Sequence, residues 1–164
     1  MSNYREKRNV ASVIIPNFNG RDLLAKNFPS VVAALKNPEN LISEVIIVDD
    51  GSDDESVSFI KENYSEIKLI KHTKNRGFSA AINTGARTAK GKLLVLLNND
   101  VSPSPNFLLK VIPHFEDKQD FAVSLHEKGY GWAKGKFENG FIVHEKGIES
   151  KEVHESFWAN GGAY

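Results

Sequence analysis

The feature that most constrains this chain is an apolar run that stops at two adjacent aspartates. Residues 45–48 read Val-Ile-Ile-Val, and Asp49 and Asp50 follow them directly. Consecutive β-branched residues favour a strand that is covered on both faces, as the strands of parallel sheets are. Gly51 then allows the backbone to turn. The pattern predicts a buried strand that carries two carboxylates to the carboxyl edge of a sheet, which is the edge where ligands bind in open α/β folds.

The hydrophobic pattern predicts alternating strands and helices on both sides of this strand. Short apolar runs indicate strands, and apolar residues at helical spacing indicate amphipathic helices. The expected strands are 10–15, 45–48, 67–71 and 92–97, with a fifth candidate at 121–125, and the expected helices are 22–36, 53–64, 78–89 and 107–115. Such an alternation with right-handed crossovers gives an α/β fold, a Rossmann-like, mostly parallel sheet with helices on both faces.

Several local signals refine these elements. Pro16 is expected to end the first strand, and Pro29 to kink the first helix or mark a restart. Ser52 and Glu55 have the spacing of a capping box that opens the second helix. The run 92–97 is apolar enough for a central strand. The glycine-rich part that follows the fifth candidate strand predicts hairpins and long loops.

The composition limits the class of protein. A chain of 164 residues with ordinary apolar content is long enough for one core, so a single domain over residues 1–164 is expected. The 21 acidic and 21 basic residues balance, which argues against nucleic acid as a partner. No run approaches the length of a transmembrane segment, and the absence of cysteine fits a cytoplasmic protein.

Polar residues follow each of the four main strands. They are Asn17 and Asn19, Asp49 and Asp50, residues 72–77, and residues 98–100. Because the carboxyl ends of parallel strands share one edge, we expect Asn17, Asp50 and Asp100 to face one crevice. Each group alone also fits a structural role, since acids before a helix favour its dipole and Asn and Asp tolerate turns. Their joint placement favours a binding site.

Four sequence blocks together are more specific than any one of them. In order they are Val13-Ile14-Ile15-Pro16-Asn17-Phe18-Asn19, Val48-Asp49-Asp50-Gly51-Ser52, Asn75-Arg76-Gly77 with Ala81, Asn83 and Gly85, and Leu97-Asn98-Asn99-Asp100. Over residues 10–116 the chain resembles the nucleotide-binding half of the family 2 glycosyltransferases, inverting enzymes of glycosyltransferase A-type fold. Residues 158–163 resemble the small-residue segment that lies beside the acceptor in that family.

The resemblance implies a division of the chain and a set of site residues. Residues 10–125 would form the nucleotide-binding core, and residues 126–164 the incomplete start of an acceptor-side region. The residues implied to bind the nucleotide sugar are Pro16, Asn17, Asn19, Asp49, Asp50, Asn75, Arg76, Gly77, Asn83, Asn98 and Asn99. Those implied on the acceptor side are Trp158, Asn160, Gly161 and Gly162.

The resemblance also implies roles for these residues. Asp50 would accept a hydrogen bond from a pyrimidine imide N–H, so UDP or dTDP sugars are expected more readily than GDP sugars. Asp100 would ligate Mn²⁺ or Mg²⁺ on the donor diphosphate. The acceptor would be a saccharide or a lipid-linked molecule in cell-wall or polysaccharide biosynthesis. A cytoplasmic protein, peripherally associated with the inner face of the membrane, would fit that role.

Two departures from the family pattern bear on activity. Asn98 stands where the family's acidic motif usually begins with Asp, which leaves Asp100 as the only carboxylate of its triplet and predicts modest metal affinity. The family's general base is expected beyond Tyr164, and Glu149, Glu152 and Glu155 are more typical of surface charge than of a substitute. We therefore expect donor binding with little or no sugar transfer by this chain.

Two other functions were weighed against the glycosyltransferase. One is a nucleotide-sugar-binding fragment without activity, which the expected absence of the base leaves open. The other is a receiver-type signalling module, in which an apolar strand also ends in two aspartates that hold Mg²⁺. That module fits poorly, because a complete strand and helix precede the Asp49–Asp50 strand here and no separate strand end offers a lone phospho-acceptor aspartate.

Overall fold

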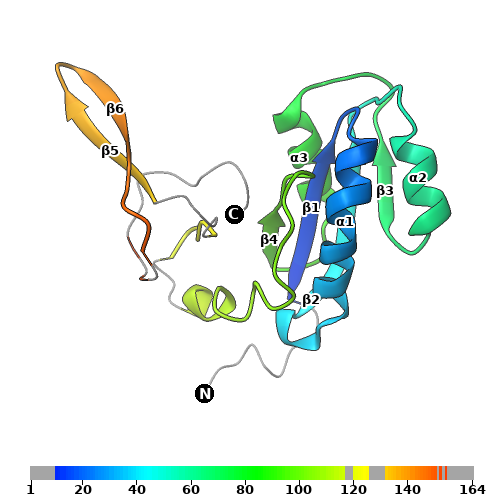
Figure 1. Ribbon diagram of the computed structural model, residues 1–164, viewed down its shortest axis with the longest axis horizontal. Coiled ribbons are helices and arrows are strands. Elements are labelled where there is room, and N and C mark those ends of the chain that lie inside the picture. Colours follow the sequence, from blue (N-terminus) through cyan, green and yellow to red (C-terminus); the bar gives the residue numbers. More distant parts are fainter. Residues whose placement is uncertain (1–9, 117–119, 126–131, 151, 153, 155–164) are drawn as a thin grey trace.

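A computed structural model describes residues 10–116, 120–125, 132–150, 152 and 154. Strands and helices alternate from the amino-terminal end, and a hairpin follows (Figure 1). The elements are β1 (Ala11–Asn17), α1 (Arg21–Lys36), η1 (Pro38–Asn40), β2 (Ile42–Asp49), α2 (Ser56–Asn63), β3 (Lys68–Lys71), α3 (Phe78–Thr88), β4 (Leu93–Leu96), η2 (Ile112–Glu116), β5 (Ala133–Glu138) and β6 (Phe141–Lys146).

The four strands β1 to β4 form one parallel sheet in the order β3-β2-β1-β4. The direction of the chain across the sheet therefore reverses between β1 and β4. In open α/β sheets such a reversal opens a crevice at the carboxyl ends of the two strands. The predicted α/β fold is confirmed, and the reversal lies between the first and fourth strands, while the crevice predicted there stays a prediction.

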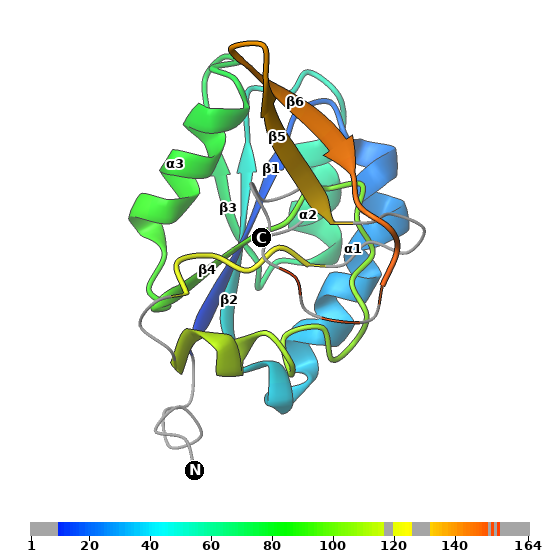
Figure 2. The same cartoon turned by 90° about the vertical axis from the view of Figure 1, so that its left-hand side faces the viewer.

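Helices cover both faces of the sheet. Figure 2 shows α3 on one side of the strands, with α1 and α2 on the other. The larger core joins α1 and α2 to the sheet through residues such as Phe28, Ile60 and Ile47. On the opposite face α3 packs closely against β1. Gly85 permits this approach, because a Cβ at this position would lie only 2.4 Å from the Ile14 side chain. The small-residue face that the sequence shows in this helix is thus used for close packing on the sheet.

Pro16 lies inside β1, which continues to Asn17. The carbonyl of Ile14 accepts from the backbone N–H of Leu97, and that of Asn17 accepts from Asp50. The backbone N–H and C=O groups of alternate residues of β1 therefore point toward β4 and toward β2. The backbone nitrogen and C=O of Pro16, like those of Ile14, point toward β4. Because β4 ends at Leu96, the N–H that proline lacks has no strand to bond there. The strand tolerates the proline for this reason.

Two local signals in the first half differ from the prediction. Of the kink or restart predicted at Pro29, the restart is wrong, because α1 is continuous and contains Pro29. The predicted capping box does not form, because the Ser52 hydroxyl donates to Asp49 at 2.6 Å and is not a helix cap. Helix α2 consequently begins later than predicted, at Ser56, whose backbone N–H is bound by the Asp54 carboxylate at 2.9 Å. A competing local contact, between Ser52 and Asp49, here overrides the capping-box signal.

Three predictions after β3 also need correction. Within the described residues β4 is an edge strand rather than a central one, and Leu94 on it is 44% exposed. Residues 107–115 form turns and the short η2 rather than an α-helix, and Pro113 removes a hydrogen bond that the helix would need. The candidate strand at 121–125 is not a strand.

The hairpin expected in the glycine-rich part is present as β5 and β6. Asn139 and Gly140 connect the strands with φ angles of 51° and 84°, which match a type I′ turn and its Asn-Gly preference. Figure 1 shows the hairpin projecting away from the parallel sheet. Among the helices of the described residues, none combines the length and the apolar character that crossing a membrane requires.

Candidate functional site

Asp49 is enclosed by hydrogen-bond donors at the carboxyl end of β2. It is 1% exposed. Its carboxylate accepts from the Asn17 side-chain amide at 3.1 Å, from the Ser52 hydroxyl at 2.6 Å and from the Ser52 backbone N–H at 3.0 Å. This carboxylate therefore closes the turn after β2 and ties it to the end of β1.

Asp50 faces the loop that follows β3. It is 4% exposed, and its carboxylate accepts from the backbone N–H of Gly77 at 2.7 Å and from that of Arg76 at 3.0 Å. The ring nitrogen Nδ1 of His72 lies 2.6 Å away. Burial opposes the charged form of Asp50, but the hydrogen bonds from His72, Arg76 and Gly77 outweigh it and lower its pKa below the ordinary value. The carboxylate is thus charged and held in one orientation.

His72 is the first of residues 72–77, which the sequence predicts at the carboxyl edge, but it is not among the residues that the resemblance implies for nucleotide binding. It is 8% exposed, and its Nε2 lies 2.9 Å from the Thr84 hydroxyl on α3. Because an ionised carboxylate can only accept, Nδ1 of His72 carries the proton toward Asp50. Its position in the sequence indicates this place at the carboxyl edge, because His72 directly follows β3 just as the other polar groups directly follow their strands.

The loop of residues 72–77 lies against the turn after β2. A Cβ on Gly51 would meet the backbone of Lys74 at 2.5 Å and that of Asn75 at 2.8 Å, and Gly51 has a φ of +78°. Gly51 is therefore required both for its conformation and for the close approach. The Asn75 side chain accepts from the Gly77 backbone N–H at 2.9 Å, which stabilises the loop locally. The guanidinium-bearing residue Arg76 is exposed.

A second group of amide side chains joins β1 to the segment after β4. The Asn99 amide donates to Asn17 at 2.8 Å, and a Cβ on Gly20 would collide with both side chains. Asn19, with a φ of 49°, donates its backbone N–H to Ser52 at 2.9 Å. The ends of β1, β2 and β4 are therefore connected by hydrogen bonds.

Asp100 lies in a turn next to this connection. The turn begins at Asn98, whose carbonyl accepts from the Val101 backbone N–H at 3.3 Å. Asp100 is exposed, whereas Asn98 and Asn99 are half-buried. Among the described residues no cluster of three or more acidic, histidine or cysteine side chains is arranged to hold a metal ion. A single carboxylate instead fits a cation that takes its other ligands from water and from substrate phosphates, as Mg²⁺ commonly does.

The structure brings together most of the predicted site residues, but not all. Asn17, Asn19, Asp49 and Asn99 form one group, and Asp50, Asn75, Arg76 and Gly77 form the other. Asn83 is exposed on α3, and Pro16 is half-buried in β1. Trp158, Asn160, Gly161 and Gly162 lie outside the described residues. Glu149 and Glu152 are exposed, as expected for surface charge.

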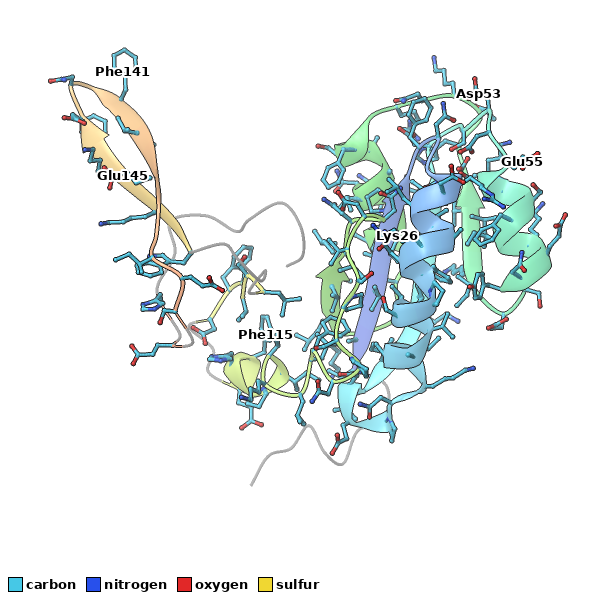
Figure 3. The ribbon with its side chains drawn as sticks, in the orientation of Figure 1. Lys26, Asp53, Glu55, Phe115, Phe141 and Glu145 are labelled. Carbon is cyan, nitrogen blue, oxygen red and sulfur yellow. The ribbon has the colours of Figure 1, made fainter. Side chains whose placement is uncertain are left out.

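A polar hollow lies beside these groups. It is lined by Asn19, Gly20, Arg21, Asp22, Leu23, Asp54 and Glu55. Figure 3 labels Asp53 and Glu55 at this end of the molecule. The hollow is therefore continuous with the carboxyl edge of the sheet, although its lining includes neither Asp50 nor Asp100.

Comparison with known proteins identifies the class to which this fold and edge belong. A family model described as Glycosyl transferase family 2 matches residues 12–158. A dolichol-phosphate mannosyltransferase of Pyrococcus furiosus is 34% identical over 131 residues, which are 78% of this chain and 35% of the relative. The chain belongs to glycosyltransferase family 2, and this assignment decides against the receiver-type alternative.

Solved structures agree on the fold. A mannosyltransferase from Pyrobaculum calidifontis, in complex with GDP-Man and Mn²⁺, matches with a TM-score of 0.59 and 26% identity over 68% of this chain and 33% of the other. Residues 1–349 of S. aureus TarS, in complex with UDP-GlcNAc, match with a TM-score of 0.55 and 23% identity over 66% of this chain and 31% of that fragment. The fold is of glycosyltransferase A type, and the chain spans about a third of the length of the Pyrococcus and Pyrobaculum proteins.

Proposed function

We propose that this chain is the donor-binding part of a metal-dependent, inverting glycosyltransferase that takes a sugar from a nucleoside diphosphate sugar. The observation that carries the proposal is the set of hydrogen bonds that links the loops at the carboxyl ends of the strands. Asp50 binds the loop after β3, and Asn17 links the ends of β1, β2 and β4. These loops form a preorganised edge at a topological switch point, where nucleotides bind in α/β folds.

Asp50 is the proposed partner of the donor base, and its hydrogen bonds favour uracil or thymine. An ionised carboxylate has about four lone-pair positions. Three donors, His72, Arg76 and Gly77, already make four contacts with these oxygens, because the Arg76 N–H is shared between both. An acceptor with so little free capacity suits the single imide N–H of uracil or thymine better than guanine, which offers two N–H groups on the same edge. UDP or dTDP is therefore proposed as the donor nucleotide ahead of GDP, even though the Pyrobaculum neighbour was solved with GDP-Man.

Asp100 is the proposed protein ligand of Mn²⁺ or Mg²⁺. Its exposed carboxylate would hold the cation, and the complex of the Pyrobaculum neighbour with Mn²⁺ supports this assignment. When bound, such a cation would neutralise charge on the departing diphosphate. Exposed Arg76 and Lys74 supply positive charge on the same edge, and Asn98 and Asn99 supply amide groups for the ribose and phosphates.

The acceptor and the catalytic base are assigned less directly. We propose a saccharide or lipid-linked acceptor and a cytoplasmic protein at the inner face of the membrane, in line with the name of the Pyrococcus relative, which acts on dolichol phosphate. The base is proposed to lie beyond Tyr164. Residues 1–164 are accordingly expected to bind donor with little or no transfer, and acceptor glycosylation by this chain would contradict that expectation.

Calorimetry tests the proposal. UDP, dTDP and GDP are titrated into the wild type and into Asp100→Ala, with and without Mn²⁺. We expect UDP or dTDP to bind more tightly with Mn²⁺ than without it. The Mn²⁺ enhancement, which is the ratio of the Kd without Mn²⁺ to the Kd with it, should be at least about tenfold smaller in Asp100→Ala. Asp53→Ala is the matched control, because Asp53 is also an exposed carboxylate at this end of the molecule. Binding that is absent, or equal with and without Mn²⁺, would contradict the proposal.

A further inference from the structure

Two buried asparagines hold the segment after β4 against the helical layer. Asn27, on α1, is 4% exposed, and Asn40, in η1, is fully buried. Buried amides need hydrogen-bond partners, and both asparagines find theirs on the segment of residues 99–108. Of these two asparagines, Asn27 binds residues 99 and 102, on either side of Asp100, whereas Asn40 binds residues 105 and 108.

Asn27 contacts the chain on both sides of Asp100. Its amide donates to the Asn99 carbonyl at 3.1 Å, and its side-chain oxygen accepts from the Ser102 hydroxyl at 2.7 Å. The amide also donates to the Leu23 carbonyl within α1 at 3.0 Å, which fixes the orientation of the side chain. The asparagine thus connects a rigid helix to both ends of the turn.

Other contacts hold one side of the turn at a time, since Asn99 before Asp100 donates to Asn17 at 2.8 Å and Val101 after it packs against the core. Strand β4 ends at Leu96, and Asp100 itself is exposed. A carboxylate that is to meet a cation on a bound diphosphate must be held close to the required geometry by its supporting residues. A buried helix residue that binds the chain at 99 and at 102 provides that support.

We propose that Asn27 is a positioning residue for the metal ligand Asp100, acting through the backbone of the turn. This inference rests on the proposed function, in which Asp100 ligates the cation. Asn27 touches neither the cation nor the nucleotide in this proposal. It fixes where the Asp100 carboxylate can lie.

Asn40 offers a matched control within the same segment. Its amide donates to the Ala34 carbonyl at 2.9 Å and to the Pro105 carbonyl at 2.8 Å, and its oxygen accepts from the Leu108 backbone N–H at 3.1 Å. It therefore makes the same number of bonds as Asn27, at a comparable depth, but to residues beyond the Asp100 turn. A merely structural role predicts the same consequences for both asparagines.

The first measurement separates positioning from stability. The Kd of UDP is measured with and without Mn²⁺ for the wild type, Asn27→Ala and Asn40→Ala, with the Tm of each. We expect both variants to lose a few degrees of Tm. The Mn²⁺ enhancement should fall about tenfold in Asn27→Ala and stay unchanged in Asn40→Ala. The Kd of UDP without Mn²⁺ should stay within about twofold of wild type in Asn27→Ala. Equal enhancement in all three proteins, or equal loss in both variants, would overturn the proposal.

Ser102→Ala provides a gentler second variant. Ser102 is exposed, so its substitution removes one bond to Asn27 without opening the core. It should reduce the Mn²⁺ enhancement in the same direction as Asn27→Ala, by a smaller factor. An unchanged enhancement in Ser102→Ala together with an unfolded Asn27→Ala would count against the proposal.

The second measurement needs neither nucleotide nor metal. Because the chain has no cysteine, a nitroxide label on Asp100→Cys reports the mobility of the turn alone. We expect a mobile spectrum in the Asn27→Ala background and a more restricted one in the otherwise wild-type and Asn40→Ala backgrounds. Equal mobility in all three would overturn the positioning role. If the wild type shows no Mn²⁺ enhancement, the metal part of the proposed function fails, and the label alone decides whether Asn27 holds the turn.

Discussion

The carboxyl edge of the sheet and the β5–β6 hairpin use their side chains in opposite ways. At the edge, Asp49 and Asp50 are buried, and their carboxylate oxygens accept hydrogen bonds from the end of β1 and from the loop after β3, through Asn17 and Gly77 respectively. In the hairpin, Lys136 forms exposed ion pairs with Glu145 at 2.8 Å and with Glu138 at 3.2 Å, while the apolar ring of Phe141 is 75% exposed. Figure 3 shows Glu145 and Phe141 on this hairpin, far from Asp53 and Glu55 at the edge.

The difference shows where the fold concentrates its interactions. Leaving a buried carboxylate, or its buried hydrogen-bond donors, without partners destabilises a protein. The free energy lost in this way is far larger than the free energy that an exposed ion pair contributes. We therefore expect substitutions at the edge to change the stability of the whole sheet. Comparable substitutions in the hairpin should change it little. The following predictions test this contrast from the largest expected effect to the smallest.

Asp49→Ala should have the largest effect. It leaves the buried Asn17 amide and the Ser52 hydroxyl and N–H without their acceptor, and these losses together should lower the free energy of unfolding by about 4 kcal/mol. Urea denaturation monitored by far-UV circular dichroism measures the change. Asp53→Ala is the control, since the Asp53 side chain is exposed and its replacement should cost less than about 0.5 kcal/mol. Equal losses in the two variants would contradict the contrast.

Gly51→Ala and Gly140→Ala compare the two regions directly. Both glycines have a positive φ, at +78° and +84°, but a Cβ on Gly51 would lie 2.5 Å from the Lys74 backbone, whereas nothing lies within 4 Å of one on Gly140. Gly140→Ala should cost only the backbone strain, about 1 kcal/mol. Gly51→Ala should cost about 3 kcal/mol, because the loop of residues 72–77 must move as well. Similar urea midpoints for the two variants would show that this loop yields easily.

Acid titration tests the charge of Asp50. Because its pKa is lowered in the folded protein, its contribution to stability is fully present above the ordinary aspartate value of 3.8 and is lost as the pH falls through the lowered pKa. Asp50→Asn should therefore show a weaker dependence of the unfolding free energy on pH below about pH 4, with one proton fewer linked to unfolding. Glu44 and Asp54, whose pKa values are also lowered, remain in both proteins. Identical pH slopes would contradict the assignment.

The sheet and its edge could be predicted because their signals are local. Apolar runs such as 45–48 identify strands by composition alone, and a polar residue directly after a parallel strand must lie at the carboxyl edge. Asp49, Asp50 and Asn99 were found in this way, and the structure places all three at that edge. Several of their partners were not predictable, because the contacts of Asn17 with Asp49 and of His72 with Asp50 join elements that are distant in the sequence.

The segment after β4 was harder to predict for a related reason. Residues 107–115 have helical spacing, yet the backbone N–H of Leu108 donates to the Asn40 side chain and Pro113 cannot donate at all. A helix over residues 107–115 would leave the Leu108 N–H in its first turn unpaired, so the Asn40 contact does not replace a helix bond, whereas Pro113 removes one from the interior. Spacing alone does not report such partners. The same holds for Asn27, whose spacing in α1 gives no indication that its amide binds residue 99.

Phe137→Ser in β5 should have the smallest effect. Phe137 is 77% exposed and lies opposite Ile142, itself 52% exposed, so its removal uncovers little additional surface. The free energy of unfolding should change by less than about 0.5 kcal/mol. Phe28→Ala is the contrasting control, because Phe28 is 1% exposed in the main core and its truncation should cost about 3 to 5 kcal/mol. Urea midpoints measure both. A loss above about 1 kcal/mol in Phe137→Ser would show that the hairpin stabilises the sheet through contacts of its aromatic face, and the contrast between the two regions would then be wrong.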